Sequence, residues 1–228
     1  MRQMKILISA ILMLGMFSGT AFSATQIEWW HAMGGALGEA VNTIVGGFNR
    51  SQTEYEMKAV YKGNYTETMT AAIAAFRAKK QPHVVQVFEV GTATMMAAKG
   101  AIYPVHQMME DAGQPFDESR YISAVIGYYT TTDGKLLSLP FNSSTPVVFW
   151  NKAAFAKAGL DRAPKTWEEM GKFSKKLISS GASECGFTIG WQSWSMLENF
   201  STWHDVAFAT KENGFAGLDT EFVFDSPL

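Results

Sequence analysis

Short apolar runs alternate with stretches of helical spacing in the first half of the chain. The expected strands are residues 27–31, 57–61 and 84–88, each bounded by polar or turn residues. The helices that follow them are expected to begin at Gly34, Tyr65 and Thr92. Strands that alternate with helices at this spacing predict an α/β fold, with a mostly parallel sheet covered on both faces.

The first two helices carry apolar residues at helical spacing, which predicts the faces that pack on the sheet. In the first helix these residues are Leu37, Val41, Ile44, Val45 and Phe48. In the second helix they are Met69, Ala72, Ile73 and Phe76.

A parallel sheet of this kind binds ligands outside the carboxyl ends of its strands. His31, Tyr65 and Glu89 lie at or just beyond such ends. The Glu89 carboxylate can accept hydrogen bonds from two ligand hydroxyls, and Tyr65 supplies a neutral donor. The alternative for Glu89 is an exposed loop carboxylate without a ligand.

Residues 139–160 lead from a polar turn into an apolar run. Pro140 and Pro146 bias the backbone between them toward extended conformations, which holds the Ser144 hydroxyl in a stiff, non-helical turn. The continuous apolar run at 147–150 then predicts a strand buried on both faces. We therefore expect this stretch to be a crossing between two lobes.

Two helices are expected after the crossing. Asn151 is placed to cap the first, and Gly159 to end it. Thr166 followed by Glu169 is a capping-box pattern for a second helix that runs to Lys176.

Elsewhere the pattern is less regular. Further helices are expected near residues 105–112, 119–126 and 196–206. A hairpin is expected between 127–131 and 136–139 around an Asp-Gly turn, and a short strand at 187–189.

Trp191 and Trp194 stand three residues apart in a loop led by glycine. Their flat apolar faces suit a carbon skeleton or a cationic head group. A place in the core is the alternative, and the polar Gln192 and Ser193 between them favour a cleft wall.

The first 23 residues have the pattern of an export signal peptide. Arg2 and Lys5 precede an apolar stretch, and Ala21 and Ser23 form a small-x-small cleavage site. Without these residues, the 19 basic residues of the chain become 17 against 21 acidic ones, a formal charge of −4. This charge does not favour a nucleic-acid partner.

Several kinds of chemistry find little support in the sequence. The Gly-x-Ser-x-Gly motif of many hydrolases is absent, and the four histidines lack metal-binding spacing. Walker-type and dinucleotide-binding glycine motifs are absent as well. The helix that begins at Gly34 could still attract an anion. We expect neither a catalytic residue, nor a metal, nor a cofactor.

The motifs FWNK at 149–152 and KAGL at 157–160 resemble those of extracytoplasmic solute-binding proteins of the maltose-binding type. Five further blocks resemble the glycerol-3-phosphate-binding members of that group. They are YKGNY at 61–65, IAAFR at 73–77, QVFEVGTATMM at 86–96, PFNSSTP at 140–146 and GWQSWSMLENF at 190–200.

The resemblance implies a two-lobe periplasmic binding protein fold of type II, in a chain about half as long as the family's. It divides the chain into a signal peptide (1–23), an N-terminal lobe (24–139), a crossing (140–150) and part of a second lobe (151–228). The whole protein would be a periplasmic monomer that captures glycerol-3-phosphate by lobe closure and presents it to the permease of an ABC importer.

The implied ligand contacts are Tyr65, Glu89, Ser144, Trp191 and Trp194. Glycerophosphodiesters such as glycerophosphocholine are further ligands that the resemblance implies. Two alternatives remain: a sugar-binding receptor of the same superfamily, and a secreted phosphodiester hydrolase.

Overall fold

A computed structural model describes residues 23–88, 91, 94, 95, 98, 100–131, 133–217 and 219–224. The expected signal peptide, the candidate ligand residue Glu89 and most of the helix expected over 92–99 lie outside these residues. The chain forms two compact units, Met1–Ile102 and Tyr103–Leu228. The lobe boundaries expected from the sequence follow a different division and stay predictions.

The first unit is built on a parallel sheet, as the sequence predicted, and its three strands lie in the order β2-β1-β3. Its strands are β1 (Thr25–His31), β2 (Tyr55–Tyr61) and β3 (Val84–Val85). Strands β1 and β2 pair along their whole length, so that His31 lies beside Tyr61 at the carboxyl end. Strand β3 is shorter than expected, although the Gln86 amide still donates to the Trp30 carbonyl at 2.8 Å.

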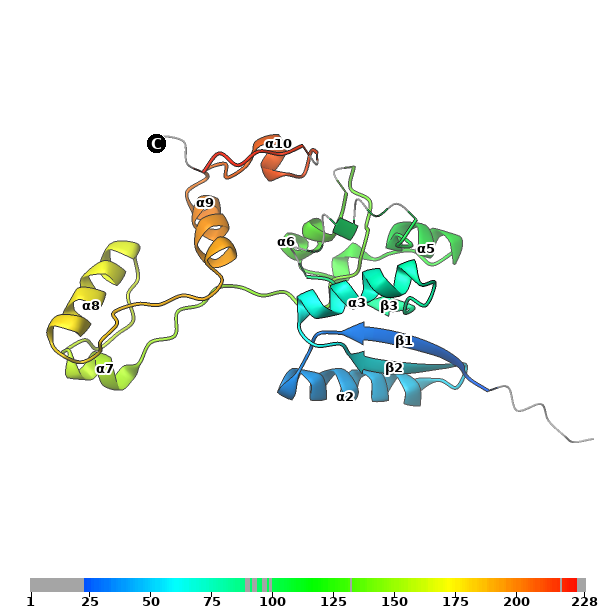
Figure 1. The fold of residues 1–228 in the computed structure, drawn as a ribbon, viewed down its shortest axis with the longest axis horizontal. Coiled ribbons are helices and arrows are strands. Elements are labelled where there is room, and N and C mark those ends of the chain that lie inside the picture. Colours follow the sequence, from blue (N-terminus) through cyan, green and yellow to red (C-terminus); the bar gives the residue numbers. More distant parts are fainter. Residues whose placement is uncertain are drawn as a thin grey trace, which may run out of the picture. The chain divides into compact units, whose positions relative to one another are not determined.

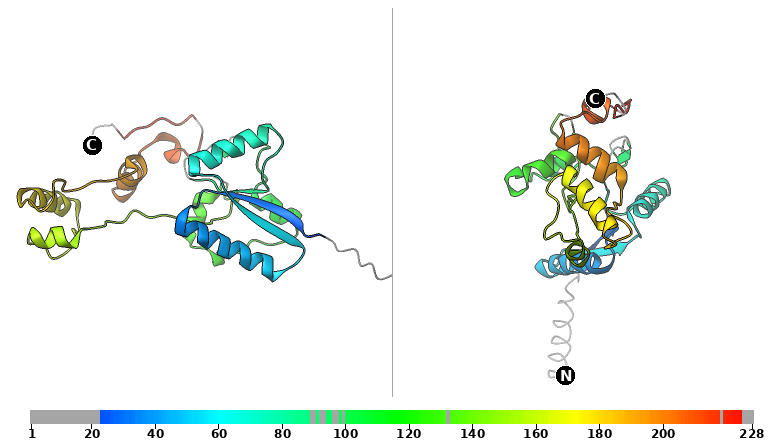
Figure 2. Two further views of the ribbon diagram at one scale, coloured as in Figure 1. Left: turned by 60° about the horizontal axis from the view of Figure 1, so that its bottom comes forward. Right: turned by 90° about the vertical axis from the view of Figure 1, so that its left-hand side faces the viewer.

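Helices α2 (Gly35–Ser51) and α3 (Tyr65–Arg77) lie on opposite faces of this sheet (Figure 1 and Figure 2). Successive residues of a strand point to opposite faces. Trp29 and Trp30 are both buried, as this arrangement requires, and Trp29 packs in a core cluster with Val41 and Val45 of α2.

The buried face of α2 is narrower than the sequence predicted. Val41 and Val45 are buried, whereas Leu37 and Ile44 are 61% and 54% exposed. The three-stranded sheet covers only part of the helix circumference. The apolar spacing therefore predicted a wider buried face than the helix has.

The start of α3 is fixed by a capping box that the sequence analysis did not assign. The Asn64 Oδ1 accepts from the Glu67 amide at 3.0 Å, and the Glu67 Oε2 accepts from the Asn64 amide at 2.7 Å. Two backbone donors at the helix end are thereby satisfied. The cap holds Tyr65 at the first position of the helix.

The second unit consists of short helices joined by extended segments (Figure 1). Its helical elements are α5 (Val105–Asp111), η1 (Glu118–Arg120), α6 (Ser123–Ile126), η2 (Gly127–Tyr129), α7 (Lys152–Lys157), α8 (Trp167–Ser179), η3 (Ser193–Glu198), α9 (Asn199–Trp203) and α10 (Thr210–Asn213). The expected hairpin is reduced to one antiparallel bridge between Thr130 and Leu136, and residues 187–189 form no strand.

The expectation of a buried strand at residues 147–150 is wrong for this structure. These residues have no assigned secondary structure, and Val147, Val148 and Phe149 are 65%, 53% and 93% exposed. A strand exists only when a neighbour pairs with its backbone, and no described segment pairs with this one. Apolar composition alone did not supply that neighbour.

Helices α7 and α8 pack together as a pair in both figures, around the buried residues Phe155, Ala158 and Leu177 (Figure 1 and Figure 2). The ends of α7 follow the sequence prediction. The Asn151 side chain accepts from the Ala154 amide at 3.1 Å, and Gly159 has a left-handed φ of 65° beyond the helix.

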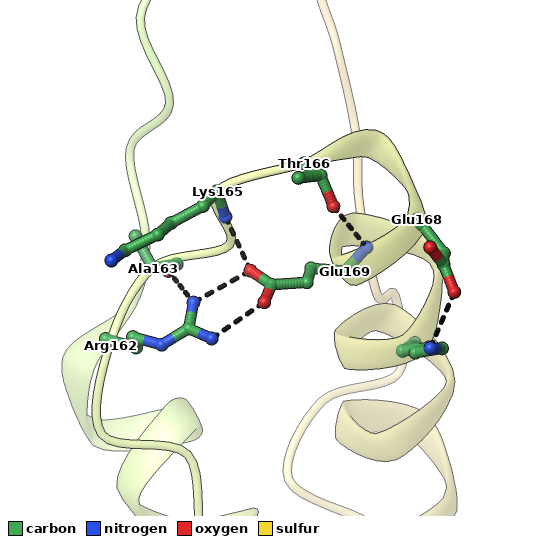
Figure 3. A network of polar contacts seen from close by, with 7 residues as sticks. Arg162, Ala163, Lys165, Thr166, Glu168 and Glu169 are labelled. Carbon is green, nitrogen blue, oxygen red and sulfur yellow. Dashed lines mark hydrogen bonds and ion pairs between the residues drawn. The ribbon is translucent and has the colours of Figure 1, made fainter.

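A polar network fixes the start of α8 (Figure 3). The Thr166 hydroxyl accepts from the Glu169 amide at 3.1 Å, as expected for the cap. The Glu169 carboxylate does not complete the expected capping box with the Thr166 amide. It accepts instead from the Lys165 amide at 2.8 Å and from both terminal nitrogens of Arg162, at 2.7 and 2.8 Å. Hydrogen bonds from Arg162 and from the Lys165 amide lower the pKa of Glu169 to about 2.

Within the described part of the chain, no helix is both long and apolar enough to cross a bilayer. The same residues contain no group of three or more metal-ligating side chains.

Candidate functional site

Tyr65 lies at the carboxyl end of the sheet in the first unit. Its ring stacks on that of Phe88, with centroids 5.2 Å apart and an interplanar angle of 9°. Glu89 comes next in the sequence but lies outside the described residues. The structure therefore brings Tyr65 next to the residue that precedes the predicted carboxylate.

Gln86 ties the end of β3 to the loop that follows β1. Its side chain is buried, and its Oε1 accepts from the Ala32 amide at 2.9 Å. The Lys62 ammonium lies 3.9 Å from the centroid of the Trp30 ring, and its backbone amide donates to the His31 carbonyl at 3.0 Å. The loops at this sheet edge are thus held by hydrogen bonds and a cation–π contact.

A hollow of about 330 Å³ lies at the same sheet edge, lined by residues that include His31, Gly34, Glu39 and Tyr61. The sequence placed His31 and the helix start at this edge but did not indicate Tyr61 or Glu39 as their neighbours. His31 is 3% exposed, and burial lowers the pKa of its imidazole. Its Nδ1 accepts from the Met33 amide at 3.3 Å. His31 and Tyr61 are the last residues of two neighbouring parallel strands, and this position is the sequence feature that could have predicted the hollow.

In the second unit, Ser144 lies exposed in an extended segment, and its hydroxyl has no hydrogen-bond partner among the described residues. This hydroxyl is therefore available to a ligand. The flanking Asn142 does make a contact within the protein.

The structure brings Trp191 and Trp194 together, with ring centroids 5.9 Å apart at 66°. Trp191 has a left-handed φ of 62° and is 47% exposed, and Trp194 lies in the π-helical turn η3. Such turns are frequent at functional sites. The pair offers part of its aromatic surface to solvent, which suits a binding wall better than a core position.

The candidate residues thus form separate groups. Tyr65 belongs to the first unit, whereas Ser144, Trp191 and Trp194 belong to the second. The assignment of these residues to one ligand stays a prediction.

A comparison with protein families matches residues 28–227 to the model of the bacterial extracellular solute-binding protein. The chain belongs to this family. As a solute-binding protein, it has the α/β class and parallel sheet that the sequence predicted.

Curated relatives cover nearly all of this solute-binding protein. An sn-glycerol-3-phosphate-binding periplasmic protein of Brucella abortus (strain 2308) is 50% identical over 210 residues, which is 91% of this chain and 48% of the relative. A protein of the same name from Yersinia pestis bv. Antiqua (strain Antiqua) is 52% identical over 215 residues, 93% of this chain and 48% of the relative. The chain spans about half the length of these relatives.

Solved structures support the fold of this solute-binding protein at lower identity. One is a mannotriose-bound protein, CpMnBP1, with a TM-score of 0.52 and 24% identity over 67% of this chain and 38% of the other. A cyclic α-maltosyl-1,6-maltose-binding protein from Arthrobacter globiformis has a TM-score of 0.52 and 21% identity, over 69% of this chain and 39% of the other. At these identities the similarity indicates the fold alone.

Proposed function

We propose that this chain contributes ligand contacts to a periplasmic receptor that captures sn-glycerol-3-phosphate for an ABC importer. The observation that carries the proposal is the identity of about half the residues, over more than nine-tenths of the chain, with relatives that bear the name of that ligand. The receptor binds and releases its ligand unchanged, and it delivers the ligand to membrane permease subunits.

The chemistry of the candidate residues fits a polyol phosphate. Glu89 would accept from the glycerol hydroxyls, and the hydroxyls of Tyr65 and Ser144 would donate to the phosphate. Trp191 and Trp194 would cover the carbon skeleton. With the same aromatic surface, the receptor also accepts glycerophosphodiesters.

Capture proceeds by closure of two lobes around the ligand. Residues 140–150 form the crossing that absorbs the change in backbone angles. The extended, exposed backbone of that segment supports this role, because few contacts oppose its movement.

Calorimetry with the exported chain tests the proposal. Ser144→Ala should weaken glycerol-3-phosphate binding about tenfold or more, because a hydrogen bond to a charged group is lost. Ser143→Ala is the matched control, since this neighbouring hydroxyl is exposed in the same turn and is not a proposed contact. Absence of binding by the unaltered chain, or equal affinities for all three proteins, contradicts the proposal.

Two further assays distinguish the alternative functions from the proposed one. A sugar-binding receptor would bind maltose in preference to glycerol-3-phosphate in a competition titration. A hydrolase would release alcohol from a glycerophosphodiester over hours, whereas the receptor leaves the diester intact.

A further inference from the structure

The hollow at the carboxyl end of β1 and β2 has the features of a binding site that the proposed glycerol-3-phosphate contacts do not use. It lies wholly within the first unit, and none of its lining residues is among those contacts. A test of this hollow can therefore fail without contradicting the proposed function, and the reverse also holds.

The floor of the hollow includes the N-terminus of α2, a helix of 17 residues. The cap residue Gly34 has no side chain to accept from the first amides, and the first turn contains no acidic residue. These amides therefore keep their hydrogen-bonding capacity and the partial positive charge of the helix end.

A buried histidine adds a second, independent feature. His31 is 97% buried and lines the hollow, and its Nδ1 already accepts from the Met33 amide. A neutral imidazole that accepts at Nδ1 carries its proton on Nε2. The Nε2–H has no hydrogen-bond partner among the described residues, so it is a donor available to a ligand.

Tyr61 supplies a third donor from the neighbouring strand. Its ring lies 6.0 Å from that of His31, because the parallel register pairs the two residues. A Cβ placed on Gly34 would lie 3.3 Å from the Tyr61 hydroxyl oxygen, so this hydroxyl stands over the helix N-terminus. Glycine at position 34 has no Cβ and so lets the Tyr61 hydroxyl approach the backbone at the start of α2.

Glu39, one turn further along α2, also lines the hollow. Its carboxylate repels negative charge on a ligand, so a doubly charged anion is disfavoured more than a singly charged one. We propose that this hollow binds a small, singly charged oxyanion, held by the amides at the start of α2, the His31 Nε2–H and the Tyr61 hydroxyl.

The test titrates the exported chain with sodium acetate, at ionic strength held constant with chloride, and follows the His31 imidazole by NMR. The resonance is assigned by its loss in His31→Gln. We expect a saturable shift in the unaltered protein. Tyr61→Phe removes one donor from a side chain that is 56% exposed, so the fold is kept, and binding should weaken about two- to tenfold.

Tyr55→Phe is the matched control, because Tyr55 occupies the opposite end of the same strand and its loss of a hydroxyl should leave the affinity unchanged. Glu39→Gln should strengthen acetate binding by removing the opposing charge. The proposal is overturned if acetate produces no saturable shift, if Tyr61→Phe binds as tightly as the unaltered protein, or if Glu39→Gln weakens binding.

Discussion

The cap of α3 offers the sharpest test of how local structure positions a candidate ligand residue. In Asn64→Ala the Glu67 amide loses its acceptor at 3.0 Å, while the Glu67 carboxylate still accepts from the backbone amide of residue 64. One of the two capping hydrogen bonds is lost at an exposed site, which costs about 1 kcal/mol. The equilibrium for opening the first turn shifts roughly fivefold.

Tyr65 is the first residue of that turn, so its stacking on Phe88 should loosen together with the turn. Urea unfolding monitored by circular dichroism should show the decrease in the free energy of unfolding. NMR cross-peaks between the two rings should weaken. Asn64→Asp keeps the acceptor and should retain both properties. Asn151→Ala removes the corresponding cap of α7 in the other unit and should leave the ring cross-peaks unchanged.

If Asn64→Ala unfolds at the same urea concentration as the unaltered protein, and its ring cross-peaks persist, the cap does not hold Tyr65. The stacking on Phe88 would then be sufficient by itself.

Further predictions concern α8. Leu177→Ala should lower the free energy of unfolding by about 2 to 4 kcal/mol, whereas Ile178→Ala, at the next and 51% exposed position, should change it by less than about 0.5 kcal/mol in the same denaturation assay. The folded-state pKa of Glu169, about 2, lies below its ordinary value of 4.5, so its ion pair with Arg162 contributes stability above about pH 4.5 that is lost as pH falls toward 2. Glu169→Gln should flatten this part of a stability-against-pH curve, and an unchanged curve would refute the role of the pair.

Sequence patterns predicted the structure correctly where it depends only on residues that are close together in the chain. Asn151 caps α7 and Gly159 follows its end, because a cap needs only a side chain, a few backbone amides and a permissive φ. Trp191 and Trp194 also lie close together, but Trp191 has a left-handed φ and lies outside the helical turn that contains Trp194, so helical spacing does not explain their contact.

The sequence predicted less of the candidate site. It placed Tyr65 at the end of the sheet, but its contact with Phe88 joins residues 23 positions apart and depends on how α3 meets β3. The exposed position of the Ser144 hydroxyl depends on the packing around its turn. The proposed ligand rests on the similarity to the relatives.

The alternation of apolar runs and helical spacing by itself determined the α/β class and the parallel sheet, because burial on both faces demands those patterns. The tertiary structure alone decided which apolar runs became strands. Residues 147–150 are more uniformly apolar than residues 27–31, yet among the described residues only 27–31 pair with neighbouring strands. It also decided the hollow between His31 and Tyr61, residues 30 positions apart that meet because strand register is set by pairing across the sheet.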